Sequence, residues 1–252
     1  MYNVYTDKLC YRKAPGSGYL WKAADIFSKY MLYKGKRKMV GFYNYTVIIT
    51  YMSLVSACLG MFFSAQGNFK AALFCLLLSG LCDMIDGPVA RTRKRTDSEQ
   101  KFGIQIDSLC DLVSFGIQPG VLVYCIAKNM ADNKAIEYVG LGVAIVFGLC
   151  AVIRLAYFNV TEEERREKEG TKKRTGYQGL PVTNAALIIP GLFNARYFTE
   201  GKVFSIIMIA GLAITAFLFV YNFKMFKLNG KKLIPVGIFG VAILVACFFT
   251  PV

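Results

Sequence analysis

The chain of 252 residues contains no histidine. This absence excludes a Ser-His-Asp triad, a His-Glu-x-x-His metalloprotease site and any proton relay through an imidazole. Its eight cysteines are scattered singly and form no Cys-x-x-Cys pair, so we predict neither a disulfide framework nor a zinc site. Any catalysis must therefore depend on carboxylates, basic groups and bound metal ions.

Charged residues are also sparse, at 18% of the chain, whereas hydrophobic residues make up 55% and gather in long runs. A helix needs about 20 apolar residues to cross a membrane. The runs predict an all-α, polytopic membrane protein with about seven transmembrane helices, at 44–63, 70–86, 104–127, 136–158, 182–198, 203–222 and 233–250. We expect a basic, amphipathic segment over 1–43, a transmembrane domain over 44–232 and an additional transmembrane helix over 233–252. A solvated basic tail is the alternative for the first segment.

The basic residues lie almost entirely on one side of this topology. If the N-terminus is cytoplasmic, 24 lysines and arginines fall in the four cytoplasmic segments, five in the outside segments and Arg154 alone within a span. Cytoplasmic loops of membrane proteins show this enrichment. It accounts for most of the net charge of +14, and no nucleic-acid-binding motif accompanies it. We expect membrane lipids, and no nucleic acid, as partners.

Four aspartates interrupt the second and third apolar runs. Asp83 and Asp86 are spaced i, i+3, and Asp107 and Asp111 are spaced i, i+4, so each pair shares one face of its helix. A buried aspartate in a membrane helix costs about 2.5–3.5 kcal/mol. Because one loop joins the two helices, the pairs should converge at one depth. Divalent cations would offset both the burial cost and the repulsion, which predicts an all-oxygen site for Mg²⁺ or Mn²⁺.

Ion pairs of these aspartates with Arg91, Arg93 or Lys101 are an alternative interpretation. This interpretation does not explain why Gly87 and Gly103 lie beside the aspartates. Glycines beside an anion site let a phosphate or a base approach the backbone, and Arg91 offers a planar donor fork for phosphate oxygens. A carboxylate-gated ion carrier would not need this combination.

The segments DMIDGPVAR and GIQIDSLCD together resemble the D-x-x-D-G-x-x-A-R … G-x-x-x-D-x-x-x-D signature of the CDP-alcohol phosphotransferases. Every fixed position is filled, by Asp83, Asp86, Gly87, Ala90, Arg91, Gly103, Asp107 and Asp111. The segment between the two halves is longer than is usual in the family. This difference concerns the conformation of the loop more than the site.

The resemblance implies a six-helix catalytic core, usually dimeric, that opens to the cytoplasmic half of the bilayer. It implies two Mg²⁺ or Mn²⁺ ions held by the four aspartates, with Asp111 also acting as the general base. The residues expected to bind CDP are Asp83, Asp86, Gly87, Ala90, Arg91 and Gly103. The leaving group would be CMP.

Further segments, FGIQIDSLCDLVSFGIQPG, IRLAYFNV and GYQGLPVTNAA, resemble the phosphatidylserine synthase branch of this family. Tyr157 stands where that branch often has a second arginine. The branch implies CDP-diacylglycerol and L-serine as substrates, a homodimer, and a location in the cell (inner) membrane with the active site facing the cytoplasm. A catalytically inactive family member serving as a binding protein is disfavoured, because every signature residue is present.

Fewer residues indicate which acceptor alcohol the protein uses than indicate its family. Arg154 could bind the serine carboxylate, or it could instead snorkel to the interface or pair with a core aspartate. Ser114 and Asn159 are candidate polar residues of the same pocket. Inositol phosphate or glycerol 3-phosphate is the alternative acceptor, but its second phosphate should require several basic groups.

Overall fold

The computed structural model describes residues 41–43, 45–90, 92–93, 95–169, 176–199 and 201–226. The chain divides into two compact units, Met1–Phe42 and Tyr43–Val252, and the fold given below is that of the second. The predicted amphipathic segment up to residue 40 and the predicted helix at 233–250 lie outside the described residues, so both stay predictions. Arg91 lies outside them as well.

The first two described helices are α2, Tyr45–Ala65, and α3, Phe69–Ala90, which pack against each other. A tight turn joins them, in which Gly67 takes a positive φ of 78° that suits a residue without a Cβ. Serine hydroxyls bond the backbone of the facing helix: Ser79 Oγ donates to the Ser53 carbonyl at 2.9 Å and Ser56 Oγ to the Cys75 carbonyl at 2.8 Å. These small polar residues let two apolar helices approach closely.

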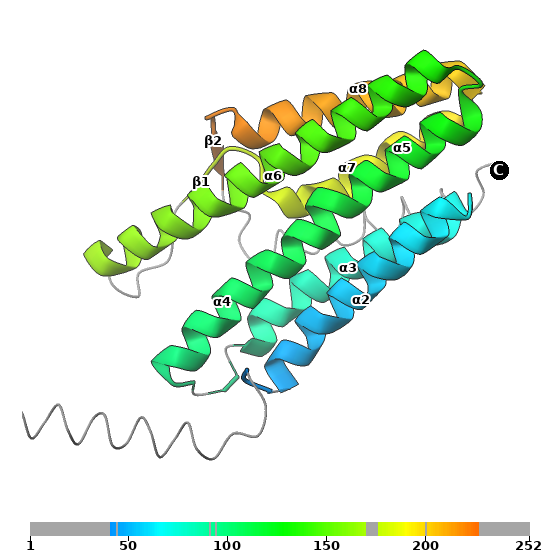
Figure 1. Cartoon of the computed structure of the whole chain (residues 1–252). Helices are drawn as coiled ribbons and strands as arrows, with labels where there is room; N and C mark the ends of the chain where they lie inside the picture. The colour runs from blue at the N-terminus through cyan, green and yellow to red at the C-terminus, as the bar shows by residue number, and fades with distance from the viewer. Residues whose placement is uncertain are drawn as a thin grey trace, which may run out of the picture. The chain divides into compact units, whose positions relative to one another are not determined.

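The next span is one long helical rod (Figure 1). It consists of α4, Asp97–Asp111, a π-helical turn η1, Leu112–Ile117, and α5, Gln118–Met130. It begins seven residues before the predicted span of 104–127, because Thr96 and Glu99 form a reciprocal capping box at its start. Pro119 lies in the first turn of α5, where a missing N–H is tolerated.

The second half of the unit contains α6, Lys134–Glu169, and α8, Gly201–Val220, which lie side by side (Figure 1). The predicted span at 182–198 is divided into η2, Val182–Asn184, the short helix α7, Ala185–Phe193, and η3, Asn194–Tyr197. Within the described residues, five helices are long and apolar enough to cross a membrane, and α7, with nine residues, is not one of them. Pro190 inside α7 removes a backbone donor, and the Asn194 amide bonds the Pro190 carbonyl at 3.3 Å.

The all-α, polytopic prediction is confirmed, with one small addition. Strands β1, Gly176–Gln178, and β2, Lys224–Phe226, pair antiparallel with Tyr177 opposite Met225. They tie the segment before η2 to the segment after α8. This pairing joins parts of the chain that are nearly fifty residues apart, and neither part shows an extended apolar alternation in the sequence.

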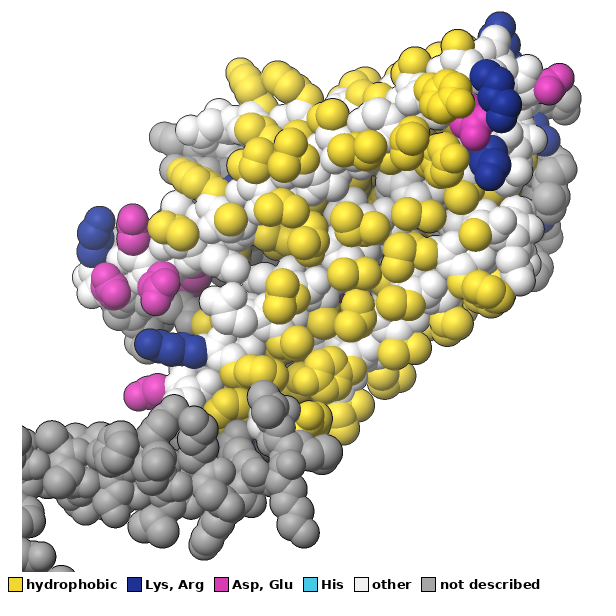
Figure 2. Space-filling view, viewed as in Figure 1, with side chains coloured by type: hydrophobic (Ala, Val, Ile, Leu, Met, Phe, Trp, Pro, Cys, Tyr) yellow, Lys and Arg dark blue, Asp and Glu magenta, His cyan; other side chains and the backbone are white. Residues whose placement is uncertain are grey.

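The core lies between α3, α5, α6, α7 and α8, and its phenylalanines Phe147, Phe193, Phe204 and Phe219 are almost completely buried. Outward-facing side chains of the spans are apolar too, such as Ile145 with 64% exposure. Figure 2 shows these apolar side chains covering the flank of the unit, with charged side chains toward its ends. A protein surface of this kind is solvated by lipid, and the chain is an integral membrane protein.

Gly60 provides a direct test of the packing between α2 and the rod. A Cβ at this position would collide with the amide of Gln118, which is fully buried and donates to the Ala72 carbonyl at 3.2 Å. We expect Gly60→Ala to destabilise the protein by about 1–3 kcal/mol, measured by thermal unfolding in detergent. Gly142→Ala is the matched control, because a Cβ there meets nothing within 4 Å, and alanine should be neutral or slightly stabilising. Equal stability of the two variants would contradict the described packing.

Candidate active site

Three of the four predicted aspartates gather between the C-terminal part of α3 and the second half of α4. Asp83, Asp86 and Asp107 each place a carboxylate oxygen within 4.8 Å of the others, and Asp86 is only 9% exposed. Asp111 lies one turn further along α4, within hydrogen-bonding reach of Asp83. The i, i+3 and i, i+4 spacings place both pairs on facing helix surfaces, so the carboxylates converge as predicted from the sequence.

The donor set of this cluster fits a hard divalent cation. Carboxylate oxygens are the ligands that Mg²⁺ and Mn²⁺ prefer, and the spacing of the oxygens allows one ion to be shared. The alternative of ion pairing receives little support from Arg93, which pairs with Glu99 at 3.8 Å instead. The cluster could therefore hold a metal ion, which would reduce the electrostatic repulsion between its carboxylates.

A threonine from α2 supports the cluster, and the sequence analysis missed it. Thr50 is 6% exposed, and its hydroxyl donates to Asp86 Oδ2 at 3.2 Å. This donor from a third helix fixes the orientation of the Asp86 carboxylate, and such support is common around metal sites. One signal could have found it: Thr50, Ser53 and Ser56 follow a spacing of three through an apolar span and mark its inward face.

The signature glycines lie beside the cluster on both helices. A Cβ on Gly87 would meet nothing within 4 Å, so the surface next to Asp86 is open. A Cβ on Gly103 would lie 3.2 Å from Nη1 of Arg95. The first glycine thus leaves room for a ligand, while the second already has a guanidinium group against it.

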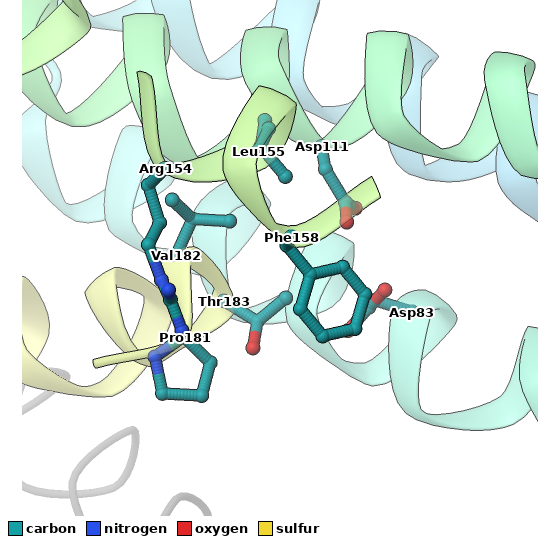
Figure 3. Close-up of a pocket in the computed structure, with 8 residues that line it drawn as sticks. All are labelled: Asp83, Asp111, Arg154, Leu155, Phe158, Pro181, Val182 and Thr183. Atoms are coloured by element: carbon teal, nitrogen blue, oxygen red, sulfur yellow. The ribbon is translucent and has the colours of Figure 1, made fainter. Parts of the chain in front are cut away.

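A cavity of about 330 Å³ opens next to the aspartates, between α3, α4, α6 and η2 (Figure 3). Its polar side chains are Asp83, Asp111, Arg154 and Thr183, and its apolar lining is Leu155, Phe158, Pro181 and Val182. Figure 3 shows the Thr183 hydroxyl between the guanidinium group on one side and the two carboxylates on the other. The cavity is large enough for a small polar molecule beside the carboxylates.

Arg154 is held by the turn that precedes η2. Its side chain is 6% exposed, with Nε donating to the Leu180 carbonyl at 3.0 Å and Nη2 to the Gly179 carbonyl at 3.4 Å. Gly179 has a positive φ of 71°, and its own N–H bonds the Phe223 carbonyl at 2.6 Å. The guanidinium group therefore links α6 to the turn beside the β1–β2 pair. These contacts hold it at the cavity wall.

The other two acceptor candidates take part in contacts between helices. Ser114 is fully buried in η1, with its hydroxyl 3.3 Å from that of Ser53. The amide of Asn159 donates to Ser108 Oγ at 2.9 Å and links α6 to α4. Neither is among the residues that line the described cavity, whereas Thr183, which the sequence analysis did not select, is.

A family model described as CDP-alcohol phosphatidyltransferase matches residues 43–217 of the chain. An archaetidylserine synthase of Methanothermobacter thermautotrophicus is 30% identical over 164 residues, which are 65% of this chain and 64% of that protein. A CDP-diacylglycerol–serine O-phosphatidyltransferase of Helicobacter pylori is 30% identical over 205 residues, 78% of this chain and 80% of that protein. The protein of the same name in Saccharomyces cerevisiae is 31% identical over 144 residues, 56% of this chain and 48% of its own length. The chain thus spans less than two thirds of the archaeal relative and about half of the yeast relative.

Proposed function

Since the chain belongs to the CDP-alcohol phosphatidyltransferase family and is a membrane-embedded transferase, we propose that it transfers the phosphatidyl group of CDP-diacylglycerol to the hydroxyl group of L-serine. CMP and phosphatidylserine are the products. The names of the bacterial and yeast relatives support the substrates. The observation that carries the proposal is the cavity in which Asp111 and Arg154 occupy opposite sides, with room for a small amino acid.

The aspartate cluster is the proposed metal centre. Asp83, Asp86 and Asp107, joined by Asp111, would hold Mg²⁺ or Mn²⁺, in two ions as the resemblance implies. A metal ion bound there would neutralise the negative charge that develops on the diphosphate. Thr50 keeps Asp86 oriented for this purpose through its hydrogen bond.

Asp111 is the proposed general base. Its carboxylate lines the cavity, where it can accept the proton of the serine hydroxyl. The serine oxygen then forms a bond to the phosphorus that carries the diacylglycerol, and the bond from that phosphorus to the CMP oxygen breaks. CMP leaves as an anion, and the proton remains on Asp111 until it exchanges with water. The remaining signature residues, Gly87, Ala90, Arg91 and Gly103, are proposed to line the CDP site.

The acceptor would lie across the cavity from the cluster. The Arg154 guanidinium is proposed to bind the serine carboxylate, and the Thr183 hydroxyl to form a hydrogen bond with the same amino acid. Ser114 and Asn159 stay predictions as acceptor residues. Their contacts with Ser53 and Ser108 support a role in holding the surrounding helices.

Thr183→Val removes the hydroxyl while keeping the volume and the β-branch of the side chain. Because a neutral hydrogen bond contributes about 0.5–1.5 kcal/mol, we expect the KM for serine to rise about two- to tenfold. The KM for CDP-diacylglycerol should stay within about a factor of two. Thr183→Ser retains a hydroxyl and should restore most of the affinity for serine. An unchanged KM for serine in Thr183→Val would remove this residue from the acceptor site.

The reaction itself is tested by measuring CMP release from CDP-diacylglycerol by the purified protein with Mg²⁺ or Mn²⁺. Serine, inositol phosphate and glycerol 3-phosphate are added separately. We expect turnover with serine alone. Turnover with a phosphorylated acceptor would overturn the proposed acceptor, and absence of CMP release with all three would favour a binding protein or an ion carrier.

Orientation and assembly are further parts of the proposal. The basic loops support an orientation with the active site facing the cytoplasm, because the α3–α4 loop is one of them and joins the two helices that carry the aspartates. The location in the cell (inner) membrane is implied by the family resemblance and stays a prediction. Cysteine-accessibility labelling of Ser98→Cys in intact and lysed cells tests the orientation, with labelling expected only after lysis. The homodimer that the family resemblance implies stays a prediction.

A further inference from the structure

The side chain of Arg95 lies against α4 at Gly103, one helical turn before Asp107. Its Nη1 is 3.2 Å from the point where a Cβ on Gly103 would stand, and the residue is half-buried. A side chain at this position would make a tight contact and push the guanidinium group back by a few tenths of an ångström. Gly103 therefore makes room for an arginine of the preceding loop.

The loop that carries Arg95 is well anchored. Thr96 Oγ1 accepts the Glu99 N–H at 3.3 Å, and Glu99 Oε2 accepts the Thr96 N–H at 3.0 Å. The same glutamate pairs with Arg93 at 3.8 Å. The capping box fixes the backbone that follows Arg95, while the charge of Arg93 is used by Glu99.

Helix stability gives no reason to place a cation here. Arg95 immediately precedes the N-cap of α4, and the positive end of the helix dipole disfavours a cation at that position. The acidic residues of the first turn, Asp97 and Glu99, already satisfy the dipole. The helix dipole therefore does not explain why Arg95 lies against Gly103.

The aspartate cluster indicates what that ligand is. Gly103 and Asp107 are spaced i, i+4 on one face of α4, which separates them by about 6 Å along the helix. A substrate diphosphate that enters beside Asp83, Asp86 and Asp107 adds negative charge to a cluster that is already acidic. A guanidinium group one turn away can bind phosphate oxygens with two parallel N–H donors.

We propose that Arg95 binds the diphosphate of the CDP-linked substrate, and that Gly103 admits its guanidinium group to that position. This inference rests on the CDP-linked donor of the proposed function and is independent of the acceptor. The role of Gly103 changes accordingly: it acts on the nucleotide through Arg95.

Arg95→Ala tests the proposal, with Arg93→Ala as the matched control from the same loop and with the same loss of charge. CDP is the probe, measured by calorimetry in the presence of Mg²⁺ and as a competitor of CDP-diacylglycerol. We expect the Kd for CDP and the KM for CDP-diacylglycerol to rise about tenfold or more in Arg95→Ala, with the KM for serine unchanged. Arg95→Lys, which keeps the charge and loses the fork, should recover only part of the affinity. Arg93→Ala should stay within about twofold of the parent protein.

A double-mutant cycle with Gly103→Ala tests the link between the two residues. The added Cβ should shift the guanidinium group by a few tenths of an ångström and spoil its alignment, so Gly103→Ala should weaken CDP binding and Arg95→Ala should add less to it than it does alone. Additive losses would overturn the link, and equal effects of Arg95→Ala and Arg93→Ala would overturn the binding role. CDP calorimetry needs no turnover, so failure of the serine reaction would leave this test intact.

Discussion

Asp111→Asn should lower kcat with serine by a factor of about 10²–10⁴, the range that a positioned general base contributes. The asparagine side chain has nearly the same size and cannot accept the proton of the serine hydroxyl. Asp111 lines the cavity beside Asp83, so the substitution changes the reacting side of the pocket and leaves Arg154 in place. The KM for CDP-diacylglycerol should change much less than kcat. CMP release under saturating substrates is the measurement.

The matched control is Asp97→Asn, which makes the same chemical change at the exposed first turn of the same helix. Its kcat should stay within about twofold of the parent value. A titration with Mn²⁺ separates two roles of Asp111. If the lost activity returns at high Mn²⁺ concentration, the residue acts as a metal ligand and not as the base, whereas a loss that no metal concentration restores supports the base.

The membrane spans were predictable because hydropathy is a local property. The predicted span at 44–63 is α2 at Tyr45–Ala65, and that at 203–222 is α8 at Gly201–Val220. Helix ends beyond the apolar runs were less predictable, since they depend on caps such as Thr96 with Glu99 and on polar extensions such as the end of α6. The division of 182–198 into η2, α7 and η3 was missed, because a continuous apolar run does not indicate where an α-helix changes to 3₁₀ turns.

The convergence of the aspartates was also predictable, because helical spacing determines which residues share a face. The hydrogen-bond partners of the site residues were not predictable from the sequence. Thr50 reaches Asp86 from a helix 36 positions earlier, and Arg154 bonds carbonyls of a turn 25 and 26 positions later. Such contacts depend on how the helices pack, and a single sequence contains no direct signal for them. The same limit explains why Arg95 was passed over although its neighbour Arg93 was considered.

Removing divalent cations should abolish turnover and also destabilise the folded protein. Asp83, Asp86 and Asp107 place carboxylate oxygens within 4.8 Å of one another, so without a cation they repel each other or must take up protons. A cation that binds only the folded state stabilises it by about 2.7 kcal/mol at a hundredfold excess over its Kd. We expect chelation to lower the Tm, and Mg²⁺ or Mn²⁺ to restore both the Tm and CMP release.

The Tm tests the metal centre without any measurement of turnover. Asp107→Asn removes one charge from the cluster, so its metal-free form should melt at a higher temperature than the metal-free parent protein. The same variant should lose most of the Tm increase on addition of Mn²⁺, because one ligand is absent. The two effects have opposite signs, which a general loss of structure cannot produce. A Tm of the parent protein that does not respond to Mg²⁺ or Mn²⁺, together with turnover that survives chelation, would refute the metal centre.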